Sequence, residues 1–201
     1  TELMDHLGLA AAHLVGNSLG GRIAIEMGLA HPERVRSVAA LCPAVAFIRR
    51  DFRHVVRLLR PELGLLPHRF TRHAVDAQLR DLFADVSTLD PAMADIVVDE
   101  FQRIYGSPGA RLAFLRAARN IYLDAPFGRG GFYTRLGALT PPALFVWGSH
   151  DRLIPPAFKP HVERALPTAG HVVLDRCGHL PQVERAEQTA GIVRRLIDRA
   201  E

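Results

Sequence analysis

Apolar and polar positions follow two different periods along this chain, and the change of period separates predicted strands from predicted helices. Short apolar runs typical of buried strands occupy residues 11–16, 35–41, 143–147 and 171–174. Apolar residues at helical spacing predict the end of a helix in residues 1–8 and further helices at 22–30, about 156–166 and 181–200. Because helical segments follow the strands, we expect four parallel strands joined by helical crossovers.

A long segment between the second and third predicted strands has no strand pattern. From about residue 43 to 140 it contains helical stretches at 49–60, 74–86, 91–105 and 110–123, separated by prolines and glycines. We therefore predict an α/β fold in three parts: a core over residues 1–43, an inserted helical cap over 44–136, and the rest of the core over 137–201. Four strands form only a half-sheet, which leaves one edge exposed.

The composition is that of a folded domain. Hydrophobic residues make up 48% of the 201 residues and charged residues 23%. The net charge of +4 comes mainly from dispersed arginines, so we expect no nucleic-acid partner. Apolar runs are too short to span a bilayer.

The cysteines and the first residue bear on location and processing. Cys42 and Cys177 match neither a disulfide framework nor a metal-ligand pattern, so we expect no metal and a reducing, cytoplasmic compartment. The chain starts at Thr1 without a signal-peptide pattern, from which we expect that an upstream segment has been removed or omitted.

The turn after the first strand has the pattern of a nucleophile elbow. Gly16, Ser18 and Gly20 match G-x-S-x-G between a predicted strand and a predicted helix. A serine in this turn takes a strained backbone conformation. We expect the chain to pack so closely around it that neither Gly16 nor Gly20 could carry a side chain. Gly21 would let the helix pack close to the strand, and the amide of Leu19 would stabilise an oxyanion at the helix N-terminus. A glycine-rich turn with an ordinary helix-capping serine is the alternative.

A carboxylate and an imidazole follow the last two strands. Asp151 lies after strand 143–147 and His179 after strand 171–174, so both reach the carboxyl edge of the sheet, where parallel sheets bind ligands. We predict that Ser18 is the nucleophile, His179 its base, and Asp151 the group that orients the base. Asp151 could instead cap the next helix, and His179 could be structural. Asp175 is a weaker candidate acid and Cys177 a weaker candidate nucleophile.

In GNSLGG, WGSHDRLIP and CGHLPQVERAE, taken in this order, the chain resembles the C-terminal two-thirds of the α/β-hydrolase superfamily, in its form with a serine nucleophile and a helical cap. Members of that superfamily begin with further strands, and a loop among them supplies the second oxyanion donor. The resemblance therefore implies a fragment of a longer enzyme. We expect the isolated chain to be inactive or poorly folded unless the missing half is supplied, and its partners would be that N-terminal half or a second copy.

The resemblance also narrows the chemistry. Epoxide hydrolases and haloalkane dehalogenases carry aspartate at the elbow, so Ser18 favours a cofactor-free hydrolase of carboxylic esters, of esterase or monoacylglycerol-lipase type, that acts through an acyl-enzyme. GNS-x-GG and CGH also resemble the hydrolases of ring-fission diketones, which carry a bulky aromatic residue where this chain has Leu180. Cleavage of a carbon–carbon bond and a non-catalytic binding module remain the alternatives.

The predicted cap bears on two questions, whether the chain contacts a membrane and what kind of substrate it binds. Residues 49–60 form a basic amphipathic stretch that could rest on an anionic membrane, although we favour packing on neighbouring helices. Its predicted apolar face consists of Phe52, Val55, Val56 and Leu59. We expect a small-molecule substrate, an acyl or aromatic ester, with an apolar cap lining formed by Phe101, Phe114, Tyr122 and Phe127.

Overall fold

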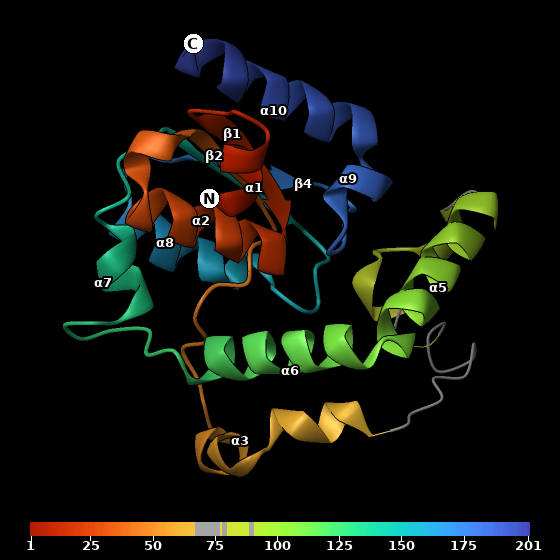
Figure 1. Cartoon of the computed structure of the whole chain (residues 1–201). Helices are drawn as coiled ribbons and strands as arrows, with labels where there is room; N and C mark the ends of the chain where they lie inside the picture. The colour runs from red at the N-terminus through yellow and green to blue at the C-terminus, as the bar shows by residue number, and fades with distance from the viewer. Residues whose placement is uncertain (67–76, 78–79, 89–90) are drawn as a thin grey trace.

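The computed structural model describes residues 1–66, 77, 80–88 and 91–201 (Figure 1). Its centre is one parallel sheet in the order β1-β2-β3-β4. The strands are β1 (Ala12–Asn17), β2 (Val35–Leu41), β3 (Ala143–Gly148) and β4 (Gly170–Leu174). The four predicted strands and their parallel arrangement are therefore confirmed, with ends that differ from the prediction by about one residue.

Helices connect successive strands. The chain begins with α1 (Glu2–His6), and α2 (Leu19–Ala30) with the short turn η1 (Pro32–Arg34) joins β1 to β2. The turn η4 (Pro156–Phe158) and α8 (Lys159–Ala165) join β3 to β4. After β4 come α9 (Pro181–Glu184) and α10 (Ala186–Ala200). The single helix predicted over 181–200 is thus broken, because Arg185 has a non-helical backbone (φ −135°, ψ 48°) and donates its side chain to the carbonyls of Asp175 and Arg176.

Both faces of the sheet are covered. On one face α2, α8 and the later helix α7 (Phe132–Leu136) pack against β2 and β3 around Ile25, Phe145 and Trp147. On the other face Ile192 and Leu196 of α10 pack against the apolar cluster formed by β2, β3 and β4. Burial on both faces explains why the strands read as continuous apolar runs. Among the described strands, none pairs with the outer edge of β1, which agrees with the predicted exposed edge.

The insertion between β2 and β3 is helical. It contains α3 (Arg53–Leu58), η2 (Pro61–Leu65), η3 (Val86–Thr88), α5 (Pro91–Gly106), α6 (Pro108–Leu123) and α7 (Phe132–Leu136). Figure 1 shows α6 and α3 below the sheet, α5 to its right, and α7 back at the left flank of the sheet. The helices predicted at 91–105 and 110–123 are α5 and α6. The helix predicted at 74–86 falls partly on residues 74–76 and 78–79, which lie outside the described residues.

The predicted cap boundaries, 44 and 136, stay predictions. At these two ends Val45 and Ala46 on one side, and Phe132 and Leu136 on the other, belong to the core cluster of the sheet. Among the described helices we find none that combines the length and the apolar composition needed to cross a membrane.

For residues 49–60 the predicted packing on a neighbouring helix is confirmed, because α3 contacts α6, but the predicted length of the helix and the cover of its apolar face are wrong. Only residues 53–58 are helical, and Phe52, Val55 and Leu59 are exposed by 70%, 58% and 53%. Helix α3 contacts α6, and Arg119 of α6 donates to the carbonyls of Val56 and Arg57 at the end of α3. Polar bonds to backbone carbonyls hold α3 there, so its apolar side chains stay largely outside the core.

Candidate active site

Ser18 occupies the sharp turn between β1 and α2. Its backbone has φ 53° and ψ −114°, a conformation that costs a non-glycine residue on the order of 1–3 kcal/mol. Three hydrogen bonds hold it: the Ser18 amide donates to the Leu41 carbonyl at 2.9 Å, and the Ser18 carbonyl accepts from the amides of Arg22 and Ala44, each at 3.0 Å. Backbone from β2 and the start of the insertion therefore enforces the strained turn.

The glycines around Ser18 play unequal roles. A Cβ atom at Gly16 would lie 2.3 Å from the Gly20 carbonyl carbon, and one at Gly21 would lie 2.9 Å from the Gly16 carbonyl oxygen. Both positions therefore need glycine for close packing, as expected. At Gly20 a Cβ atom would meet no heavy atom within 4 Å. The expectation that Gly20 must also lack a side chain is wrong within the part of the chain that the structure describes.

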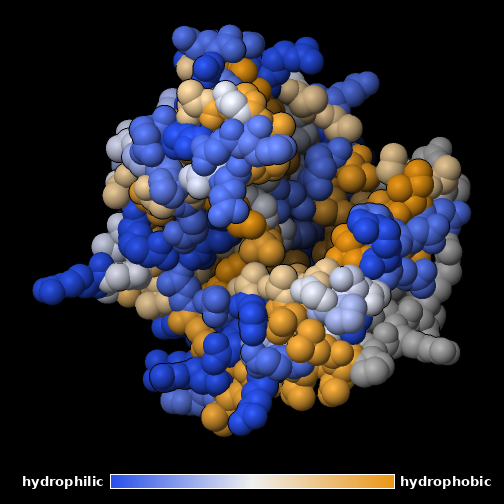
Figure 2. All heavy atoms as spheres, viewed as in Figure 1, coloured by the Kyte–Doolittle hydropathy of each residue, from blue (hydrophilic) through white to orange (hydrophobic). Residues whose placement is uncertain are grey.

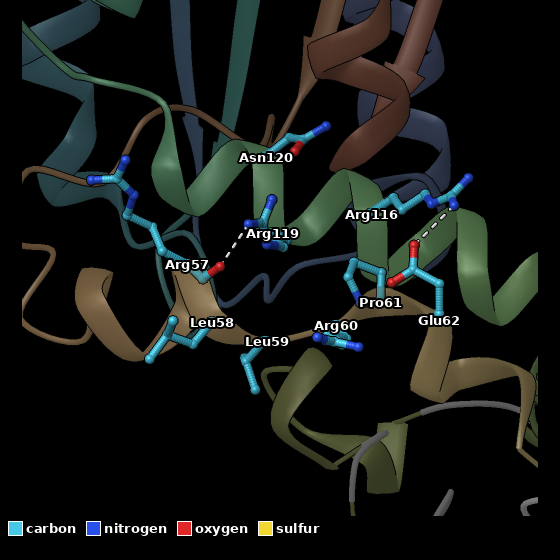
Figure 3. Close-up of a pocket in the computed structure, with 9 residues that line it drawn as sticks. All are labelled: Arg57, Leu58, Leu59, Arg60, Pro61, Glu62, Arg116, Arg119 and Asn120. Carbon is cyan, nitrogen blue, oxygen red and sulfur yellow. Dashed lines mark hydrogen bonds and ion pairs between the residues drawn. The ribbon is translucent and has the colours of Figure 1, made fainter.

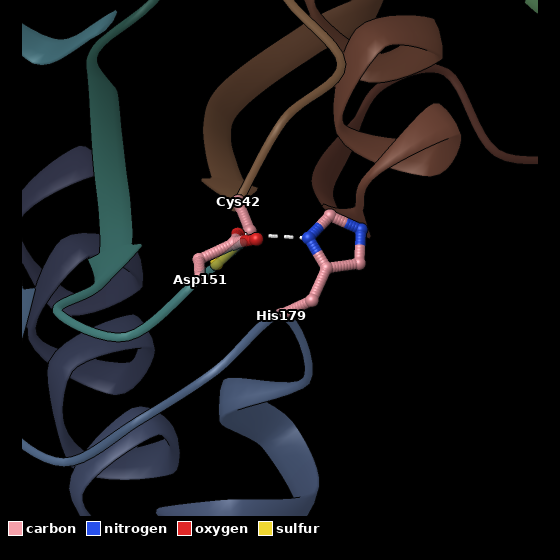
Figure 4. Close-up of side chains that lie close together, drawn as sticks. All are labelled: Cys42, Asp151 and His179. Carbon is pink, nitrogen blue, oxygen red and sulfur yellow. Dashed lines mark hydrogen bonds and ion pairs between the residues drawn. The ribbon is translucent and has the colours of Figure 1, made fainter. Parts of the chain in front are cut away.

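Asp151 and His179 form a buried hydrogen-bonded pair (Figure 4). The distance between His179 Nδ1 and Asp151 Oδ2 is 2.8 Å, and neither side chain is more than 3% exposed. Asp151 Oδ1 accepts from the amides of Leu153 and Ile154 at 2.9 and 2.8 Å. One carboxylate thus binds both the imidazole and the backbone of its own loop, whereas the alternative role as a helix cap is wrong, because η4 has Pro155 at its N-cap and no side-chain cap bond. These bonds direct the Nδ1 proton of a neutral imidazole toward Asp151.

The other nitrogen of the His179 ring has different surroundings. His179 Nε2 is buried and makes no hydrogen bond with any residue that the structure describes. The Asn17 side-chain amide donates to the His179 carbonyl at 2.9 Å and to the Leu41 carbonyl at 3.1 Å, so the residue before Ser18 fastens the elbow to the histidine loop. Sequence reasoning missed Asn17, although it lies inside the elbow motif.

Glu184 links the histidine loop to the insertion. Its Oε1 accepts from the Gly178 amide and its Oε2 from the Ala84 amide, both at 2.8 Å, and the His179 amide donates to the Leu82 carbonyl at 2.6 Å. A Cβ atom at Gly178 would lie 2.5 Å from the Leu82 oxygen. The loop that carries His179 therefore packs on the backbone of residues 82–84. The sequence signal that could have pointed to Glu184 is its place as an acidic residue in the first turn of the helix after His179.

Cys42 lies beside Asp151 and His179, so the three residues form a cluster of potential metal ligands (Figure 4). The ligand atoms of Cys42, Asp151 and His179 lie within 4.8 Å of one another. However, both Asp151 oxygens already accept hydrogen bonds, and burial followed by the negative charge of Asp151 raises the pKa of the Cys42 thiol far above its ordinary value. Metals bind the thiolate, so this site fits an acid–imidazole pair better than a metal.

The two weaker candidates from the sequence lie apart from this chemistry. Burial, followed by the charge of Glu184, raises the pKa of Cys177 to about 12, so its thiol is neutral and a poor nucleophile. Asp175 is exposed and forms an ion pair with Arg176 at 3.6 Å.

A largely apolar cavity of about 530 Å³ opens at Ser18 and Leu19. The other walls come from the segment after β2, from α3, η2 and α6, and from the loop that follows Asp151. The residues are Ala44, Phe47, Val56, Leu59, Arg60, Pro61, Leu63, Phe114, Leu115, Ala118, Arg119, Ile121, Tyr122, Leu153 and Ile154. Phe114 and Tyr122 line it as predicted. Phe101 instead packs with the cluster around Phe83, and Phe127 stacks on Tyr133, so the prediction is wrong for these two.

Comparison with known proteins agrees with this geometry. Residues 1–186 match the family described as alpha/beta hydrolase fold. A dihydrolipoyllysine-residue acetyltransferase component of an acetoin cleaving system from Pseudomonas putida is 30% identical over 92% of this chain and 45% of that protein. A 2-hydroxymuconate semialdehyde hydrolase from the same species is 28% identical over 99% of this chain and 66% of that protein.

Among solved structures, a membrane phospholipase A described as a bacterial virulence factor is 25% identical with a TM-score of 0.74, over 98% of this chain and 60% of that one. The chain therefore spans about half the length of the acetyltransferase component, just under two thirds of the semialdehyde hydrolase and three fifths of the phospholipase.

Proposed function

Because this chain belongs to the α/β-hydrolase family, we propose that it carries the catalytic residues of a serine hydrolase that cleaves carboxylic esters. The observation that supports this most directly is the buried 2.8 Å hydrogen bond between Asp151 and His179, which leaves His179 Nε2 without a partner among the described residues. The strained turn at Ser18 adjoins the same histidine loop through Asn17.

The proposed reaction proceeds in two halves. His179 Nε2 takes the Ser18 hydroxyl proton while the oxygen attacks the ester carbonyl, and Asp151 stabilises the imidazolium that forms. The Leu19 amide, at the N-terminus of α2, donates to the oxyanion of the tetrahedral intermediate. His179 then protonates the leaving alcohol, and water, deprotonated by the same nitrogen, hydrolyses the acyl-enzyme. Leu19 is the one oxyanion donor that we assign.

The cavity indicates the class of substrate. Apart from Arg60, Arg119 and Ser18, its lining is apolar and includes Phe114 and Tyr122, which suits an acyl chain or an aromatic group. The similarity to a membrane phospholipase A supports an ester substrate.

A carbon–carbon bond hydrolase is the second candidate. The similarity to a 2-hydroxymuconate semialdehyde hydrolase favours it, and Arg60 in the cavity wall could bind an acidic substrate. Leu180, next to His179, packs toward Phe83 and Val98 of the insertion, at the position where the ring-fission hydrolases carry a bulky aromatic residue.

The test combines covalent labelling with turnover. The chain is exposed to a fluorophosphonate probe and measured by intact mass spectrometry, with Ser18→Ala and the exposed-site control Ser87→Ala alongside. We expect one adduct in the wild type and in Ser87→Ala, none in Ser18→Ala, and a loss of ester turnover on the order of a million-fold in Ser18→Ala. Labelling that persists without Ser18 would overturn the assignment. Turnover of a ring-fission diketone but not of p-nitrophenyl esters would select the second candidate.

A further inference from the structure

A short stretch of chain over α3 and η2 carries many exposed apolar side chains. Seven large apolar residues between positions 52 and 66 are each 47% to 82% exposed. They are Phe52, Val55, Leu58, Leu59, Leu63, Leu65 and Leu66, and we call them, with the neighbouring Arg53, Arg57 and Arg60, the α3–η2 face. Figure 2 shows this region as hydrophobic and strongly hydrophilic residues side by side at the lower edge of the molecule. A concentration of this kind marks an interaction surface.

The charges on this face are predominantly positive. Residues 49–66 contain five arginines and two acidic residues, and one of the acids, Glu62, is already paired with Arg116 at 3.0 Å. The guanidinium groups of Arg57 and Arg60 form no hydrogen bond or ion pair with any described residue (Figure 3). They border a surface cleft of about 610 Å³, to which Arg116 and Arg119 also contribute. The face therefore presents unpaired cationic groups around exposed leucines.

We propose that the α3–η2 face docks on an anionic phospholipid bilayer. The apolar side chains would enter the boundary between headgroups and acyl chains, while the arginines bind lipid phosphates, the arrangement that holds amphipathic segments at a membrane interface. A second copy of the chain fits less well, because a symmetric interface would bring the arginines of both copies together.

Docking at this face would place the cavity next to the bilayer. Val56, Leu59, Arg60 and Leu63 belong to the same segment and line the cavity that reaches Ser18. If the proposed function holds, an ester dissolved in the bilayer enters the cavity without crossing bulk water. This consequence rests on the proposed function, whereas the docking itself does not.

The experiment measures partition of the chain between buffer and lipid vesicles by sedimentation. Vesicles of pure phosphatidylcholine are compared with vesicles that contain about one third phosphatidylglycerol. The charge variant is Arg53→Gln/Arg57→Gln, matched by Arg194→Gln/Arg199→Gln on α10, which removes the same charge from a distant exposed helix. The apolar variant is Leu58→Ser, matched by Leu3→Ser on α1, where the leucine is 70% exposed beside Glu2 and Asp5.

We expect the anionic vesicles to bind the wild type at least about tenfold more strongly than neutral ones, and high salt to weaken this binding. The Arg53→Gln/Arg57→Gln variant should lose about 25-fold in partition coefficient and Leu58→Ser about fivefold, while both matched controls stay within about twofold of the wild type. Ser18→Ala should bind vesicles as the wild type does, which separates this result from failure of the proposed function.

Three results would overturn the proposal. One is equal binding to neutral and anionic vesicles, or none to either. Another is an equal loss in the α3 and α10 charge variants, which would indicate net charge alone. The third is a dimer in solution that Leu58→Ser converts to a monomer, which would assign the face to a second copy.

Discussion

Gly16 and Gly20 belong to the same five-residue motif, yet only Gly16 faces other backbone. We expect Gly16→Ala to destabilise the chain by about 3 kcal/mol, because its Cβ would overlap the Gly20 carbonyl, 2.3 Å away, and backbone cannot move aside cheaply. Gly20→Ala should be neutral or stabilise by up to about 1 kcal/mol, because it lies in open space in the first turn of α2. Urea unfolding followed by circular dichroism measures both. Equal costs at the two positions would contradict this reading of the elbow.

Residue types and their order along the chain were enough to predict that Asp151 and His179 form a pair and that Ser18 lies at the same edge of the sheet, whereas contact between the Ser18 and His179 side chains stays a prediction. Ser18, Asp151 and His179 stand at the ends of predicted strands, so parallel pairing alone brings them to one edge of the sheet. The roles of Asn17 and Glu184 could not be predicted, because each binds the backbone of a segment distant in sequence. Every residue type offers the same backbone donor and acceptor, so the sequence does not show which residue such a hydrogen bond will reach.

At the scale of elements, Glu184 is the connection between α9, the histidine loop and the insertion. We expect Glu184→Ala to destabilise the chain by about 2 kcal/mol, since the amides of Gly178 and Ala84 both lose a charged acceptor. Labelling of Ser18 by the fluorophosphonate should also slow, because the loop that carries His179 loosens. Glu187→Ala, in the first turn of α10, is the control and should change neither quantity. A stability loss with unchanged labelling would mean that Glu184 supports the fold alone.

A second connection joins α2 to the end of α6 through charges. Arg22 pairs with Glu26 and with Asp124, and Arg135 pairs with the same two acids at 2.8 and 3.1 Å. Arg22 also lies 4.1 Å above the centre of the Phe132 ring. Burial by itself raises the pKa of Glu26, but hydrogen bonds and charge from Arg135 and Arg22 outweigh it and hold the pKa below the ordinary value of 4.5.

This lowered pKa gives the network a defined pH dependence. A carboxyl whose pKa is lowered by folding stabilises the protein above its unfolded-state pKa, and this contribution disappears as the pH falls through the folded-state value. We therefore expect Glu26→Gln to be less stable than the wild type at pH 7, with the difference shrinking between about pH 5 and pH 3. Chemical unfolding of both proteins across this range measures it. A difference that stays constant with pH would show that Glu26 contributes through packing.

Elements differed in how far the sequence could predict them. Strands buried on both faces leave continuous apolar runs, so their existence and ends were predictable within about one residue. The exposed face of α3 was not predictable, because periodicity shows that a helix has an apolar side and not whether a neighbour covers it. The break at Arg185 depends on carbonyls of Asp175 and Arg176, which the helical pattern does not record.

At the scale of the whole molecule, stability should be distributed unevenly. β2 and β3 are paired on both sides and lie between two helical layers, whereas β1 is paired on one side and, among the described elements, α3 mainly contacts α6. We expect amide hydrogens of β2 and β3 to exchange on the order of 100-fold more slowly than those of α3. Hydrogen exchange with mass spectrometry resolves these segments. Equal protection of α3 and β3 would contradict the division into a firm core and a loosely held α3.

The contact between His179 and residues 82–84 sets a limit on how this protein can be redesigned. The proposed catalytic side chains stand on the core, and most of the cavity wall stands on the insertion, so exchanging the insertion would be the obvious way to change substrate preference. A donor segment must nevertheless offer a carbonyl to the His179 amide and an amide to Glu184. Libraries that randomise α3, η2 and α6 while keeping the backbone path of residues 82–84 should therefore yield more active variants than wholesale grafts of a foreign lid.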